Sequence, residues 1–247
     1  NRPMIPGNRK FLTNECAHNW QYNGQTIVFC TEGHLIEGQH RLQGCIDSGI
    51  PIVSYVVVGI PHSAQSTMDS GKTRTGKDTM AMNCHSHPGE LAATARLIRG
   101  CWKFGICVAA TMYKQTNHEA EKFPSEWPNV HASVALGVRM NKMTVIPAPV
   151  ISACYFLTMR DDPVTAEHFW DTFENTGPGC AWDDPAMALR RYKRPGGRGT
   201  SVRQVHWLRI VVKAWNLYKA GEKVSQILLA DDETVTMRHC PSNTTGA

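Results

Sequence analysis

The sequence predicts an α+β protein in which a small mixed α/β module, residues 1–85, precedes a helical module, residues 86–247. Two observations support this prediction. The run with the strongest strand character, residues 52–58, lies in the first part, whereas apolar residues recur at helical spacing from Glu90 onward. The chain has 247 residues, of which 42% are hydrophobic and 19% charged. This is long and apolar enough to bury a core without disulfides or a structural metal.

Turn signals and periodicity place the elements of the first module. Asn23-Gly24 and Glu32-Gly33 precede two short apolar runs, which predict strands. Helical spacing of apolar residues after the second run predicts a helix that ends at Gly49 in a left-handed C-cap. Three consecutive valines indicate a third strand. The elements predicted in this module are helix 9–20, strands 25–29 and 35–36, helix 39–48, strand 52–58 and a helical turn over 63–68.

The second module contains amphipathic patterns separated by glycine and proline. Pro124 and Pro128 mark a break and the start of a further helix, and Gly221 suits a helix C-cap. The strongest helix predictions are 90–104, 150–159, 163–174 and 202–220.

Composition limits the classes of function. Nine cysteines cannot all pair with one another, and none forms a C-x-x-C motif, which favours a reducing, cytoplasmic setting. No apolar run is long enough to cross a bilayer, and the first residues lack an apolar signal stretch, so no membrane partner is expected. The segment Cys84-His85-Ser86-His87 has poor spacing for tetrahedral zinc, so we predict no metal there.

The most informative segment for chemistry joins a predicted strand to a predicted helix through Gly38. Such a turn directs backbone N–H groups and the positive end of the helix dipole at an anion. Arg41 offers a planar fork for phosphate oxygens, and His40 offers a further donor. Glu37 can bind Mg²⁺ or accept a proton from a hydroxyl. We expect removal of Arg41, as a surface arginine at the start of a helix, to abolish phosphate binding and to leave the fold intact. The alternative is an ordinary strand–helix corner with polar surface residues.

Four motifs resemble those of proteins with the ParB/sulfiredoxin-like fold, especially a phage and prophage branch. Gly38-Gln39-His40-Arg41 is similar to its G-Q-H-R signature. The other three, in order, are residues 20–27 (W-x-x-N-G-x-x-I), residues 68–75 (D-T-G-K-K-R-T) and residues 211–221 (I-K-A-W-N-x-Y-x-x-G). Together they span nearly the whole chain, and residues 110–200 match only in helical character.

The resemblance implies a nucleotide site. It places Gly38, Gln39, His40 and Arg41 at the phosphates of a nucleoside triphosphate, ATP or CTP. The implied catalytic residues are Glu37, His40 and Arg41, with Glu37 as a ligand of Mg²⁺. Lys72 and Arg74 lie in a loop that can close over phosphates or a DNA backbone.

This chain departs from the family's motifs at several positions, and these differences argue against some of the family's activities. Gln39 stands where sulfiredoxins have their reactive cysteine, which argues against reduction of sulfinic acid. The paired arginines, helix-turn-helix and dimerisation tail of partition ParB proteins are not found. The resemblance also implies a further segment before Asn1, including a first strand.

A basic segment raises the prospect of a nucleic-acid partner. No acidic residue lies between Asp184 and Glu222, and the candidate DNA contacts are Arg190, Arg191, Lys193 and Arg194. The alternative is a solvated loop and helix face. The leading hypothesis is a nucleotide-dependent phosphotransferase or NTPase in phage or prophage DNA metabolism. The others are a ParB-like DNA-binding or nuclease module without nucleotide turnover, and a non-catalytic scaffold.

Overall fold

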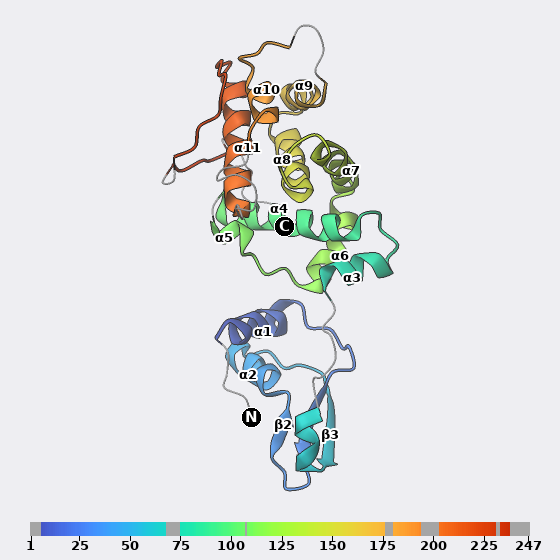
Figure 1. Ribbon diagram of the computed structural model, residues 1–247. Coiled ribbons are helices and arrows are strands. Elements are labelled where there is room, and N and C mark those ends of the chain that lie inside the picture. The colour runs from blue at the N-terminus through green and yellow to red at the C-terminus, as the bar shows by residue number, and fades with distance from the viewer. Residues whose placement is uncertain are drawn as a thin grey trace. The chain divides into compact units, whose positions relative to one another are not determined.

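The computed structural model describes residues 6–67, 75–106, 108–175, 180–193, 203–230 and 233–237. The chain forms two compact units, Asn1–Thr73 and Arg74–Ala247 (Figure 1). A small mixed sheet with helices precedes a mainly helical region, so the predicted α+β class is confirmed. The division lies before residue 85, because α3 (Gly76–Met82) packs on α4 (Pro88–Phe104) and α6 (Asn117–Glu126) of the second unit.

The first unit contains a three-stranded mixed sheet of order β2-β1-β3. Its central strand, β1 (Thr26–Cys30), pairs antiparallel with β2 (Leu35–Glu37) and parallel with β3 (Tyr55–Ile60). The parallel pair requires a crossover, and the chain between β2 and β3 supplies it with the helix α2 (Gln39–Ser48). α2 packs against α1 (Pro6–His18), and the 3₁₀ helix η1 (His62–Thr67) follows β3.

The core of this unit is small. Val28, Cys30 and Ile36 are buried together, and Val57 and Ile60 pack against them. Among the described strands β3 pairs with β1 alone, and Val58 is 72% exposed. The three valines therefore form an edge strand with little buried area. With so little apolar burial, each polar contact contributes a larger fraction of the stability of this unit than it would in a unit with a large core.

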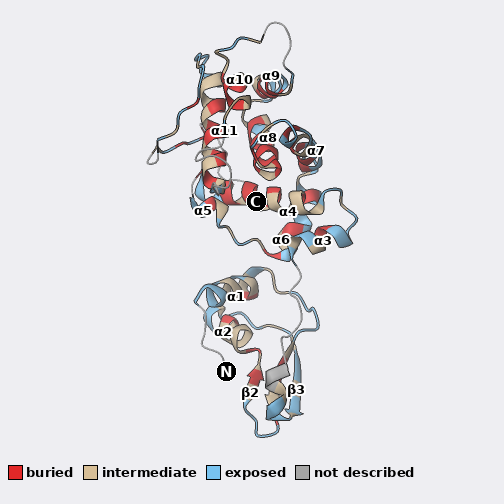
Figure 2. Ribbon diagram, in the orientation of Figure 1, coloured by how far each residue is buried: buried red, intermediate tan, exposed pale blue. Residues whose placement is uncertain are grey.

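The second unit is a helical assembly around α8 (Ala148–Asp161), which packs against α4, α7, α9 and α11. The remaining described helices are α5 (Val108–Thr111), α7 (Val130–Asn141), α9 (Pro163–Glu174), α10 (Pro185–Arg190) and α11 (Gln204–Lys219). Buried residues concentrate here (Figure 2), and the largest are Trp170, Trp215, Phe123, Phe169 and Phe173. No described helix combines the length and the apolar character that a membrane span requires.

Most predicted elements occur close to their expected positions. α9 covers the predicted range, and Gly49 ends α2 in the left-handed region with φ of 69°. β3 begins at Tyr55 rather than at residue 52, and the carbonyl of Val53 and the side chain of Ser54 make other contacts. Trp20 Nε1 donates to the carbonyl of Val53 at 2.9 Å, and Ser54 Oγ donates to the carbonyl of Gln25 at 2.9 Å.

The break and the further helix predicted from Pro124 and Pro128 are present, but the break lies at residues 127–129 and not at Pro124. Pro124 lies inside α6 and is buried beside Phe123, so packing there offsets the backbone hydrogen bond that proline cannot donate. The helix ends only at Glu126, and α7 begins at Val130.

Candidate functional site

The strand–turn–helix predicted around Gly38 is present. β2 ends at Glu37 and α2 begins at Gln39, with Gly38 as a left-handed N-cap at φ 98°. A Cβ on this residue would lie 3.1 Å from Ile27 Cγ1 and 3.2 Å from Ile27 Cα, so only glycine fits the turn without strain. No side chain caps the N-terminus of α2. The turn thus directs the positive end of a helix at whatever lies beyond it.

Arg41 is bound within the first unit by three hydrogen bonds. Its Nη2 donates to Glu37 Oε1 at 2.6 Å and to the carbonyl of Thr26 at 2.9 Å, and Nη1 donates to Gln25 Oε1 at 2.6 Å. The Arg41 side chain is only 12% exposed and that of Glu37 is 25% exposed. The expectation of an arginine at the surface was therefore wrong: Arg41 ties the first turn of α2 to the start of β1.

The structure brings together Glu37, Gly38 and Arg41, and it adds Gln25 to them. Gln39 and His40, the first two residues of α2, are half-buried beside this group. Lys72 and Arg74 lie outside the described residues. Sequence reasoning missed Gln25. The available signal was a polar residue directly between a turn glycine, Gly24, and the first residue of a strand, but its partner is 16 residues away.

Arg190 and Arg191 form the first part of the basic segment, and both donate hydrogen bonds to backbone carbonyls of the second unit. Arg190 Nη1 donates to the carbonyls of Phe173, at 2.7 Å, and Glu174, which end α9. Arg191 Nη2 donates to the carbonyl of Trp182 at 2.6 Å, and its guanidinium lies 3.7 Å from the centre of the Trp182 ring. These contacts favour a structural role for both arginines.

The rest of the segment is also largely paired where it is described. Lys213 forms an ion pair with Glu233, and Lys219 forms one with Asp161 at 3.0 Å. Lys193 is exposed, and Arg194 lies outside the described residues. Contact of the basic segment with DNA stays a prediction. Because Arg190 and Arg191 already donate to carbonyls within the unit, they have fewer donors left for DNA phosphates.

Replacing Arg190 with alanine is expected to destabilise the second unit by about 1–2 kcal/mol, because two carbonyls at the end of α9 lose their donor. Lys193→Ala, three residues away and exposed, should change stability by less than about 0.5 kcal/mol. Urea unfolding followed by tryptophan fluorescence measures both. Equal effects of the two substitutions would contradict the structural role of Arg190.

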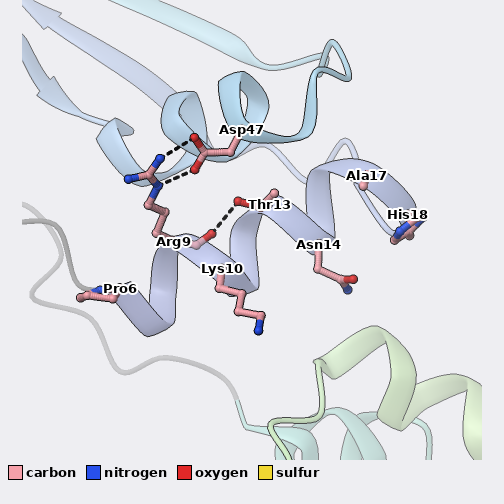
Figure 3. Close-up of a pocket in the computed structure, with 8 residues that line it drawn as sticks. All are labelled: Pro6, Arg9, Lys10, Thr13, Asn14, Ala17, His18 and Asp47. Carbon is pink, nitrogen blue, oxygen red and sulfur yellow. Dashed lines mark hydrogen bonds and ion pairs between the residues drawn. The ribbon is translucent and has the colours of Figure 1, made fainter.

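A hollow of about 540 Å³ is lined by residues of α1 and by Asp47 of α2 (Figure 3). Its basic residues are Arg9, Lys10 and His18. Arg9 reaches Asp47 in a two-pronged ion pair, with Nε–Oδ2 at 2.5 Å and Nη2–Oδ1 at 2.7 Å. The hydrogen bonds from Arg9 and Gln43 lower the pKa of Asp47 to about 2. Arg9 is thus already neutralised, and none of the predicted phosphate-binding residues lines this hollow.

One group of potential metal ligands occurs among the described residues, and sequence reasoning missed it: Cys30, Glu32 and His34, in the turn between β1 and β2. Their alternate spacing around the Glu32-Gly33 turn was the available signal. The residues of the Cys84–His87 segment do not gather into such a group within the described structure.

Family models, curated proteins and solved structures contain no match to this chain. The fold and the site therefore define only a structural class. The protein is an α+β protein with a polar, glycine-capped helix N-terminus beside a small mixed sheet.

Proposed function

We propose that the β2–α2 turn binds the phosphates of a nucleoside triphosphate together with Mg²⁺, and that the protein is a phosphotransferase or NTPase. The observation that supports this best is the position of the Arg41–Glu37 pair within one turn of the uncapped N-terminus of α2. A guanidinium, a carboxylate and a helix N-terminus are the groups that recognise a magnesium-bound polyphosphate.

Each residue has a distinct part in this proposal. Gly38 has no side chain to stand between the backbone and the phosphates, and a Cβ at this position would lie 3.1 Å from Ile27 Cγ1. Glu37 carries a negative charge that repels bare phosphate, so its carboxylate needs Mg²⁺ between itself and the nucleotide. Arg41 holds that carboxylate in place through its 2.6 Å bond, which makes its first role one of positioning.

One donor atom of the Arg41 side chain has no hydrogen-bond partner in the structure. Nε is buried without a hydrogen-bond partner, although both terminal nitrogens are bonded. Buried donors without partners are rare in folded proteins, and a bound ion is one of the ways in which such an atom finds a partner. The resemblance of residues 38–41 to the G-Q-H-R signature supports the same assignment.

Calorimetric titration of the full chain with ATP, CTP and GTP, with and without Mg²⁺, tests the proposal. We expect at least one nucleotide to bind, and to bind more tightly when Mg²⁺ is present. Glu37→Gln should remove most of that magnesium dependence while binding itself persists, because the amide keeps the size of the side chain but loses its charge. If Glu37 is also the base, release of inorganic phosphate should fall by about 10²-fold or more.

Arg9→Ala is the matched control, because Arg9 is an ion-paired arginine of the same unit that contacts α2 at its other end, through Asp47. This variant should bind nucleotide as the wild type does. Failure of the folded wild type to bind any of the three nucleotides would overturn the proposal.

A further inference from the structure

A second cluster of chemistry-bearing side chains lies at the other end of β2 from Gly38. Cys30 is the last residue of β1, and Glu32 and His34 belong to the four-residue connection that leads into β2. One atom from each residue, the Cys30 Sγ, a Glu32 carboxylate oxygen and a His34 ring nitrogen, lies within 4.8 Å of the other two. The three residues offer sulfur, oxygen and nitrogen in one place.

The backbone of this turn is held by hydrogen bonds that keep the three residues together. The Cys30 N–H donates to the carbonyl of His34 at 2.9 Å, and the Gly33 N–H donates to the carbonyl of Cys30 at 3.0 Å. Gly33 has φ of 80°, a left-handed conformation that a side chain would strain. The Thr31 N–H donates to the carbonyl of Ile60, which anchors the turn to the end of β3.

Two further bonds orient the potential ligands themselves. The backbone N–H of His34 donates to Cys30 Sγ at 3.3 Å. The Thr31 hydroxyl donates to Glu32 Oε1 at 2.9 Å. Such partners behind a ligand fix its orientation and raise the affinity of metal sites.

The three side chains differ in exposure. Cys30 is only 3% exposed, whereas Glu32 and His34 are exposed. Glu32 and His34 can therefore meet an ion from the solvent, and Cys30 supplies its sulfur from the buried side of the turn.

We propose that Cys30, Glu32 and His34 bind one Zn²⁺, with the fourth position of the tetrahedron left to water. Sulfur, imidazole and carboxylate together are a ligand set that Zn²⁺ prefers, and Mg²⁺ and Ca²⁺ avoid sulfur. In a tetrahedral zinc site the ligand atoms are about 3.3–3.6 Å apart, so the three side chains must move closer by at most about 1.5 Å. The exposed side chains of Glu32 and His34 have the freedom to do so. Binding releases the thiol proton of Cys30 to solvent.

Three ligands with an open position are typical of catalytic zinc sites rather than structural ones. The assignment is independent of the proposed nucleotide site, because it uses no residue of the β2–α2 turn. It also differs in chemistry, since Glu37 has no sulfur or imidazole partner in its network.

Titration of the full chain, reduced and stripped of metal, with Co²⁺ and then with Zn²⁺ tests the proposal. We expect Co²⁺ to produce a sulfur-to-cobalt charge-transfer band and the visible bands of a tetrahedral ion, and Zn²⁺ to displace it. Cys30→Ser should abolish the charge-transfer band. Glu32→Gln and His34→Gln should each weaken Zn²⁺ binding about tenfold or more in competition with a chromogenic chelator.

Cys45→Ser and His18→Gln are the matched controls, since they remove a thiol and an imidazole from α2 and α1 of the same unit. Both should leave the affinity for Zn²⁺ unchanged within about twofold. Because Glu32 and His34 are exposed, their variants are expected to fold even if Cys30→Ser does not, and circular dichroism checks this. Zn²⁺ binding that Glu32→Gln and His34→Gln leave unchanged would overturn the proposal, as would the absence of a charge-transfer band in the wild type.

Discussion

Replacing Arg41 with alanine is expected to destabilise the first unit by about 2–3 kcal/mol. The substitution leaves the Glu37 carboxylate, the Gln25 amide oxygen and the Thr26 carbonyl without their common donor, in a region where the arginine is 12% exposed. The core of this unit contains few buried side chains, so that loss is a large fraction of its stability. Hydrogen–deuterium exchange over residues 26–48 should accelerate locally, while the amides of α8 should not change.

Arg41→Lys and Arg9→Ala separate the possible causes of that effect. Lysine keeps the charge but cannot donate to three acceptors in one plane, so it should recover only part of the stability. Arg9 is exposed, and its removal should leave the exchange of residues 26–37 unchanged. An Arg41→Ala protein as protected as the wild type would show that the network contributes nothing, and loss of nucleotide binding in that variant would then report on the phosphate site alone.

Gly100→Ala is expected to destabilise the second unit by about 3 kcal/mol. A Cβ on Gly100 would lie 2.1 Å from the carbonyl oxygen of Ala110, so α4 and α5 must separate to admit it. The displaced atoms belong to backbone, which cannot rotate away as a flexible side chain can. The midpoint of urea unfolding, followed by the fluorescence of the buried Trp170 and Trp215, should fall with little change in slope.

Gly89→Ala is the matched control on the same helix. Its Cβ would meet the side chain of Lys77 at 3.6 Å, an ordinary contact, so the lower entropy of the unfolded chain should stabilise the protein by about 0.5 kcal/mol. Opposite signs for the two substitutions are the expected result. A loss at Gly89 equal to that at Gly100 would mean that α4 does not tolerate alanine for reasons other than the close approach of α5.

Local features of the fold were predictable because their causes are local. Gly38 and Gly49 bound α2 at left-handed positions, where glycine is favoured on its own backbone energetics. α9 begins at a proline, which suits the first helical position, and its apolar spacing continues to Glu174. The α+β class followed from the same kind of evidence, since strand and helix periodicities can be recognised within a few residues.

The roles of the charged side chains were not predictable in this way. Arg190 is 17 residues from Phe173, and Arg41 is 16 residues from Gln25, so the acceptors that hold them come from other elements. A run of basic residues has the same composition whether it faces solvent or caps a neighbouring helix. Only packing distinguishes the two, because the end of α9 presents carbonyls to Arg190.

The α+β class, the strand–turn–helix at Gly38 and the helical nature of the second unit could be predicted from the sequence. These depend on backbone preference and on periodicity over one or two turns. Three further features emerge only from packing: Arg41 ties α2 to β1, α3 belongs with the second unit, and Cys30, Glu32 and His34 lie together. Each of these depends on where one element lies against another. That is set by the burial of apolar faces and by the pairing of strands, neither of which a local stretch of sequence contains.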